Sequence, residues 1–210
     1  MLPPVEYGIQ RRSICLMPAK GDNLEWLFEQ YNKEMVWQMF GMAGPGREII
    51  EARHKAGELV VGITYRVSDW TRVGFVTVYP PNPVRKGWEV GQAIPDPAHR
   101  NAGHAQDVGD AIGHYMFDHL GVGMIALRVR EDNPASMRVV EALGYKRYGT
   151  WPSRGFNFHY YSIDPEQWKA RVATLAAQNP DEDVFFLGPD EVPENVKSSC
   201  EGGAADAPEA

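Results

Sequence analysis

The stretch Arg100-Asn101-Ala102-Gly103-His104-Ala105 joins a run typical of a strand, residues 87–94, to a run typical of a helix, residues 105–119. The first backbone N–H groups of a helix have no partner within the helix, and the helix dipole favours negative charge at that end. Gly103 has no Cβ and lets a phosphate approach the backbone, and the small Ala105 extends that clearance. This turn predicts a site for a ligand that carries phosphates.

A second motif follows later in the chain, with Asn133-Pro134-Ala135-Ser136 and then Leu143-Gly144-Tyr145. Together the two motifs resemble the GCN5-related N-acetyltransferase (GNAT) family. Its pyrophosphate loop reads Gln/Arg-x-x-Gly-x-Gly/Ala, and its later helix begins with Asn-x-x-Ser/Ala and closes on Leu-Gly-Phe/Tyr. The resemblance covers residues 6–165 and is greatest to the branch that acetylates the N-termini of ribosomal proteins.

The order of the expected elements agrees with that family's architecture. Strands are expected at 6–17, 59–67, 73–79, 87–94, 124–129, 145–151 and 156–163, and helices at 24–35, 47–55, 105–119, 135–143 and from Asp164 on. The predicted fold class is α/β (α+β), with a central, mostly antiparallel mixed sheet of about seven strands and helices on both faces. The resemblance implies that this sheet is splayed at an acetyl-CoA cleft.

Bulk composition is that of an ordinary soluble domain. The chain has 210 residues, of which 43% are apolar and 23% charged. No run is apolar enough for a membrane span, and the N-terminus has no signal-peptide pattern, so a cytoplasmic protein is expected. The two cysteines, Cys15 and Cys200, form neither a disulfide framework nor a zinc-binding spacing.

Charge separates the chain into two parts. The net charge is −7, but residues 181–210 hold nine acids and one base, which leaves the rest nearly neutral. A neutral body gives no basic face for nucleic acid and no strong attraction for a polycation. We therefore predict an acetyltransferase domain at 1–178 and an acidic, flexible tail at 179–210.

One apolar island interrupts this tail, Val184-Phe185-Phe186-Leu187. Two exposed phenylalanines are unfavourable in water, so the segment is expected to fold back onto the protein's own surface. The alternative is that it docks on another protein or supports a homodimer.

The resemblance implies how acetyl-CoA is held. Backbone N–H groups near Ala93 and Ile94 would contact the acetyl carbonyl and the pantetheine arm. Asn133 would hydrogen-bond that arm, with Ser136 near the thioester sulfur. The other reading of Asn133 is a helix N-cap before Pro134. The pyrophosphate would lie on the turn formed by Arg100, Asn101, Ala102, Gly103, His104 and Ala105.

Acetyl transfer to an amine also needs a general base and a group that protonates the leaving thiolate. Glu89, on the strand before the turn, is the candidate base, acting directly or through a water; the alternative is a solvent-facing glutamate. Many family members carry a tyrosine acid where this chain has Val140. Ser136, Tyr145 or release of the thiolate into water are the substitutes.

A third pattern on the helix at 105–119 is compatible with metal binding, since Asp107, Asp110, His114 and Asp118 fall at helical spacing. Such a row is more typical of a solvated helix face, so no metal is expected. The predicted function is transfer of an acetyl group from acetyl-CoA to a primary amine, either a protein N-terminus or a small molecule. The alternative is a non-catalytic GNAT-fold module that docks through its tail and sheet edge.

Overall fold

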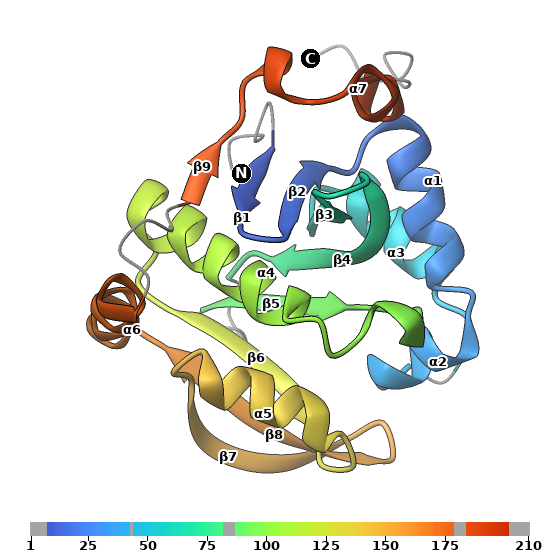
Figure 1. Cartoon of the computed structure of the whole chain (residues 1–210). Helices are drawn as coiled ribbons and strands as arrows, with labels where there is room; N and C mark the ends of the chain where they lie inside the picture. Colours follow the sequence, from blue (N-terminus) through green and yellow to red (C-terminus); the bar gives the residue numbers. More distant parts are fainter. Residues whose placement is uncertain (1–7, 43, 82–86, 179–183, 202–210) are drawn as a thin grey trace.

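One mixed sheet organises the part of the chain that the computed structural model describes, residues 8–42, 44–81, 87–178 and 184–201 (Figure 1). Its nine strands run in the order β7-β8-β6-β5-β4-β3-β2-β1-β9, and only β5 and β6 are parallel neighbours. The strands are β1 (Ile9–Arg11), β2 (Ile14–Pro18), β3 (Val60–Arg66), β4 (Thr71–Tyr79), β5 (Trp88–Ala93), β6 (Ile125–Arg130), β7 (Lys146–Ser153), β8 (Phe156–Ile163) and β9 (Val184–Phe186).

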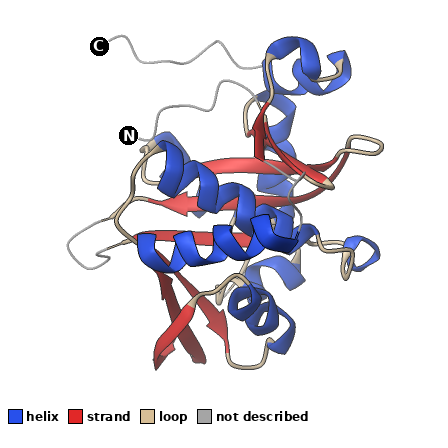
Figure 2. Ribbon diagram, turned by 60° about the vertical axis from the view of Figure 1, so that its left-hand side comes forward, coloured by secondary structure: helices blue, strands red, loops and turns tan. Residues whose placement is uncertain are grey.

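Helices cover both faces of the sheet, each over its own hydrophobic core. One face carries α4 (His104–Gly113), the π-helical stretch His114–His119, α5 (Pro134–Ala142) and α6 (Pro165–Gln178). The other carries α1 (Gly21–Gln30), α2 (Glu34–Met39), α3 (Arg47–Lys55) and α7 (Glu194–Glu201). Short 3₁₀ turns lie at Pro97–His99 and Pro189–Glu191. The ribbon in Figure 2 shows helices packed over the strands. The predicted fold class is confirmed.

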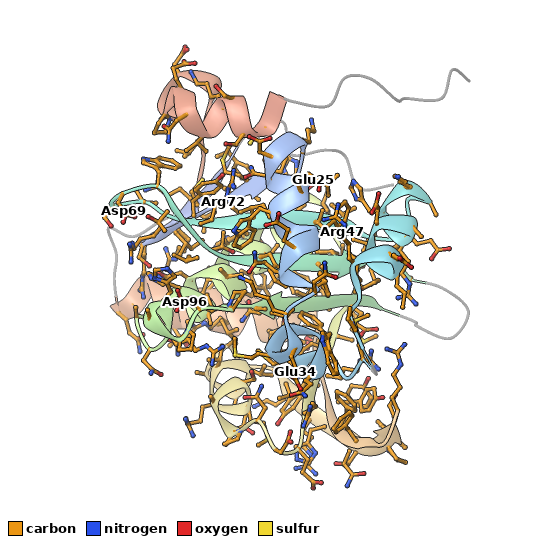
Figure 3. The ribbon with its side chains drawn as sticks, turned by 90° about the vertical axis from the view of Figure 1, so that its right-hand side faces the viewer. Glu25, Glu34, Arg47, Asp69, Arg72 and Asp96 are labelled. Carbon is orange, nitrogen blue, oxygen red and sulfur yellow. The ribbon has the colours of Figure 1, made fainter. Side chains whose placement is uncertain are left out.

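Alternation along the strands explains the two cores. On β4, Val76 and Val78 pack under α4, whereas Phe75 packs on the opposite side beneath α1 and α2. Successive side chains of a strand point to opposite faces, so one apolar strand serves both layers. On the second face, Arg47 at the start of α3 pairs with Glu25 of α1 at 2.7 Å and links the two helices (Figure 3).

The sheet has more strands than the sequence predicts because the N-terminal segment forms two strands and residues 184–186 add another. The single strand expected at 6–17 is a hairpin in its described part, with β1 and β2 turned at Arg12 and Ser13. Arg12 adopts a left-handed φ of 45°, a conformation that no periodicity in the sequence signals.

The flexible tail expected at 179–210 is wrong for residues 184–201. β9 pairs with β1, and Leu187 donates its backbone N–H to the Gly8 carbonyl at 2.8 Å. Leu187, Val192 and Val196 are buried in the core beneath α1 and α7. The apolar island therefore folds onto its own chain, because it completes the β1 edge and covers apolar surface. Residues 179–183 and 202–210 lie outside the described part.

No helix among the described residues is both long enough and apolar enough to cross a membrane.

Candidate active site

The site begins where β5 and β6 separate. Only Trp88 with Ile125 and Glu89 with Ala126 are paired, although both strands continue beyond these pairs. The strands then diverge (Figure 1). Parallel neighbours normally pair along their shared length, so this separation leaves an opening within the sheet. The splay predicted from the sequence lies at this point.

A cavity of about 980 Å³ occupies the opening. Its lining includes Gly109 and Ile112 of α4 on one face of the sheet and Phe40 and Ile50, of the α2–α3 region, on the other. The cavity therefore connects the two faces through the split. Its volume lies in the range of small-molecule and cofactor sites.

The predicted phosphate turn lies past the end of β5 and opens α4. Gly103 is the N-cap residue with φ +84°, and a Cβ there would meet no atom within 4 Å. The described residues provide no hydrogen-bond acceptor for the backbone N–H groups of Gly103 and Ala105. Open space and unpaired donors at a helix N-terminus are the features an anion site needs.

The side chains of this turn point elsewhere. Arg100 donates from Nε to the Ile94 carbonyl at 2.9 Å and from Nη2 to the Pro95 carbonyl at 2.9 Å. Its guanidinium therefore braces the loop that leads into the turn. The His104 ring is buried, with Nδ1 2.8 Å from Ser13 Oγ. Only the backbone of His104 is available to a ligand in this arrangement.

The remaining cofactor candidates lie on β5 and α5. Asn133 caps α5, since its Oδ1 accepts the Ser136 N–H at 3.1 Å, so the N-cap reading is correct. Asn133 and Ser136 also line the cavity, and no described residue bonds the Asn133 side-chain amine or the Ser136 hydroxyl. Ala93 and Ile94 lie past the last β5–β6 pair; the lining reaches Gln92, whose Nε2 bonds the Ala105 carbonyl at 3.1 Å.

All three catalytic candidates line the same cavity. Glu89 reaches it from β5 and pairs with Arg128 of β6, with Oε1 and Nε 3.4 Å apart. Ser136 reaches it from α5. Tyr145 is buried below α5; desolvation, together with the negative charge of Asp110, raises the pKa of Tyr145 well above its usual value. A phenol with a raised pKa stays protonated and can donate a hydrogen bond.

The solvated row expected on the helix at 105–119 holds only in part, because Asp118 is exposed whereas Asp107 and Asp110 are buried. Asp110 is fully buried and accepts two hydrogen bonds of 3.1 Å from Arg171 of α6. Asp107 is buried and accepts the Ser13 hydroxyl at 2.6 Å. These partners come from segments distant in the sequence, so helical spacing alone could not reveal them. Across the described ranges, no group of three or more His, Cys, Asp or Glu residues could hold a metal.

Several lining residues were missed by the sequence analysis. Tyr148 and Tyr160 form an aromatic wall with ring centroids 6.2 Å apart. Arginines from three separate segments complete the set: Arg53, Arg128, Arg130 and Arg154. For Arg128 and Arg130 a signal existed, because residues two apart on a strand share a face. Nothing in the sequence places Arg53 or Arg154 near them.

Comparison with known proteins identifies the class. A family model described as acetyltransferase (GNAT) domain matches residues 14–146. The chain therefore belongs to the acetyltransferase (GNAT) domain family, the class of acetyl-CoA-dependent N-acetyltransferases. No curated protein sequence matches this chain.

Solved structures share the fold. Spermidine N-acetyltransferase from Vibrio cholerae, in complex with CoA and spermine, has a TM-score of 0.64 at 15% identity, covering 75% of this chain and 99% of its own. A GNAT acetyltransferase from Bacillus anthracis gives 0.62 at 18% identity, covering 76% and 99%. The enzyme AAC(6')-Ib, with ribostamycin and coenzyme A, gives 0.63 at 16% identity, covering 75% and 96%. The predicted likeness to the ribosomal-protein branch finds no support among them.

Proposed function

We propose that the protein transfers the acetyl group of acetyl-CoA to the primary amine of a small molecule. The observation that carries this proposal is the cavity through the β5–β6 split, which is lined by Asn133 and Ser136 at the start of α5 and by Glu89 of β5. A donor entering from the α4–α5 face and an acceptor entering from the α2–α3 face would meet inside it.

The donor would be held by backbone as much as by side chains. The N-terminus of α4 at Gly103 offers N–H groups to the pyrophosphate, and the Asn133 side-chain amine offers a donor to the pantetheine arm. Beyond Glu89, β5 pairs with β4 but not with β6, so the backbone N–H groups on its β6 side, which recur at every second residue up to Ile94, would supply further donors; Ala93 is paired with Phe75 of β4.

The chemistry follows from the positions of the lining groups. Glu89 accepts a proton from the acceptor ammonium, directly or through a water, and the free amine nitrogen attacks the thioester carbonyl. A C–N bond forms, the C–S bond breaks and the sulfur leaves as a thiolate, while the attacking nitrogen loses its second proton to water. Ser136 or Tyr145 donates a hydrogen bond to that sulfur. Where neither hydroxyl reaches the thiolate, water supplies its proton.

Two observations favour this function over a non-catalytic docking module. The segment 184–187, which suggested docking, is paired with β1. The proteins with similar structures include a spermidine N-acetyltransferase and an aminoglycoside acetyltransferase, both named for small molecules that carry amines. A protein N-terminus stays the alternative acceptor.

Calorimetric titration with acetyl-CoA at near-physiological salt tests the proposal. We expect a micromolar dissociation constant, followed by release of free thiol when amines are added. Absence of binding up to millimolar acetyl-CoA would contradict the proposal and favour the non-catalytic module.

A further inference from the structure

The charged residues that line the cavity are mostly of one sign. Among the described lining residues there are four arginines and one acid, and they are Arg53, Arg128, Arg130, Arg154 and Glu89. The rest of the lining is apolar, aromatic or uncharged. The cavity is thus cationic, although residues 1–180 taken together are nearly neutral.

Three of these arginines, Arg53, Arg128 and Arg130, lie on the α2–α3 face of the sheet, from which the acceptor is proposed to enter. Arg130 donates from Nη1 to the Gln38 carbonyl of α2 at 2.8 Å. The guanidinium carbon of Arg128 lies 5.2 Å from the centroid of the Phe158 ring. The same ring packs against Gly41, which follows α2. Arg53 belongs to α3. The phosphate turn opens α4, which packs on the other face, so the arginines are not placed to serve the pyrophosphate.

Their charge is only partly neutralised. Arg128 pairs with Glu89, and Arg130 pairs with the exposed Asp132. Arg53 packs over the Tyr79 ring, with the guanidinium carbon 5.9 Å from its centroid, and neither Arg53 nor Arg154 has a carboxylate partner within the described residues. A cleft lined by one sign of charge focuses its field and concentrates ligands of the opposite sign.

We propose that the acceptor is a primary amine that also carries an anionic group, a carboxylate or a phosphate. Arginine binds both groups through paired, charge-assisted hydrogen bonds, and such bonds are stronger away from bulk water. A purely cationic polyamine would meet repulsion from the same side chains. The inference rests on the proposed function, and it sets this chain apart from the spermidine and aminoglycoside acetyltransferases that share its fold.

Matched acceptor pairs test the charge requirement. Thiol release would be measured with leucine against leucinamide, phosphoethanolamine against ethanolamine, and spermidine. We expect kcat/KM at least about tenfold higher for the anionic member of one pair, which also decides between carboxylate and phosphate. The α-amine of an amide loses its proton more readily than that of the acid, so the intrinsic bias opposes this result.

The same compounds would also be titrated against CoA-loaded protein. For a compound that is acetylated too slowly to measure, its dissociation constant then tests the charge requirement. Preference for spermidine, or no advantage for the anionic member of either pair, would overturn the inference and leave acetyl transfer intact. So would failure of every anionic amine to bind CoA-loaded protein. Failure of acetyl-CoA itself to bind overturns the proposed function instead.

A charge-neutralising variant locates the effect. Arg53→Gln is expected to lower kcat/KM for the preferred anionic acceptor about tenfold while the dissociation constant of acetyl-CoA stays unchanged. Lys55→Gln removes the same charge from the same helix, but Lys55 is exposed and does not line the cavity, so it serves as the control. Weaker acetyl-CoA binding in Arg53→Gln, with no change toward the acceptor, would mean that the arginines hold the donor.

Discussion

Glu89 and Arg128 face each other where β5 and β6 separate, with Oε1 and Nε 3.4 Å apart and both side chains about a quarter exposed, at 24% and 30%. Glu89 is paired with Ala126, the last residue of β6 that bonds β5, so the carboxylate sits at the start of the split. The guanidinium holds the carboxylate against the cavity that both residues line. This position is suited to receive a proton from an amine that enters the cavity.

Glu89→Gln is therefore expected to lower kcat about a hundredfold, because an amide keeps the shape but cannot take a proton. The dissociation constant of acetyl-CoA should not change, since the donor is held elsewhere. Steady-state kinetics over a range of pH measure the fall in kcat, and calorimetry measures the dissociation constant of acetyl-CoA. Glu29→Gln, on the exposed side of α1, is the control. Matching pH profiles of kcat/KM in the variant and the parent would remove Glu89 from the mechanism.

Gly103→Glu tests the phosphate turn. The substitution places bulk and negative charge where the backbone donors open α4, and we expect acetyl-CoA affinity to fall at least about a hundredfold by calorimetry. Strain is the competing explanation, because Gly103 has a φ of +84°.

Gly121→Glu controls for that strain. Gly121 has a φ of +64°, no atom within 4 Å of its added Cβ, and a place in the connection beyond the far end of α4. Both variants should lose similar stability in thermal unfolding, and only the first should lose the donor. Equal acetyl-CoA binding in Gly103→Glu and the parent would show that the turn holds no phosphate.

The sequence predicts the centre of this fold well and its margins poorly. The helix expected at 47–55 coincides with α3, and the strand, turn and helix around Gly103 appear where expected. These elements are strongly periodic or carry a local turn signal, so their own residues are enough to predict them. The Arg12 turn and the β9 strand have no such signal, since the first depends on backbone conformation and the second on a partner strand more than 170 residues away.

The candidate site, too, is predicted from the sequence only in part. Backbone features, such as the open turn at Gly103, follow from local sequence. The directions of side chains do not follow from local sequence. Arg100 and His104 fit the motif, yet Arg100 hydrogen-bonds the Ile94 carbonyl and the His104 ring contacts Ser13. The cavity arginines come from α3, β6 and the β7–β8 turn, so only tertiary packing brings them together.

Truncation tests whether residues 184–201 belong to the folded body. Ending the chain at Gln178 removes β9, leaves the β1 edge unpaired and uncovers the site of Leu187, Val192 and Val196. Burial of three such side chains contributes about 4 kcal/mol or more, so the melting temperature should fall by roughly 10 °C. Ending the chain at Glu201 keeps these contacts and is the control, for which no change in melting temperature is expected. Equal melting temperatures for both truncations would place residues 184–201 outside the core.

The Ser13–His104–Asp107 cluster predicts a pH-dependent stability. The Ser13 hydroxyl donates to Asp107 at 2.6 Å, so its oxygen accepts from His104 Nδ1–H, and the neutral form of the ring is assigned the Nδ1–H tautomer. Burial lowers the pKa of His104; Asp107 opposes the shift, and the positive charges of Arg66 and His99 reinforce it. Below about pH 6.5 the unfolded chain binds a proton that the folded protein resists, so stability is full above that pH and is lost as pH falls through it.

The expected loss is up to about 1 kcal/mol in the free energy of unfolding between pH 7 and 5.5, measured by urea denaturation. His104→Gln should reduce this loss, because glutamine does not titrate. Part of the loss should persist in that variant, since burial also lowers the pKa of His54 and acts with the same sign. His54→Gln combined with His104→Gln should remove most of it. An unchanged pH dependence in the double variant would show that neither ring resists protonation in the folded protein.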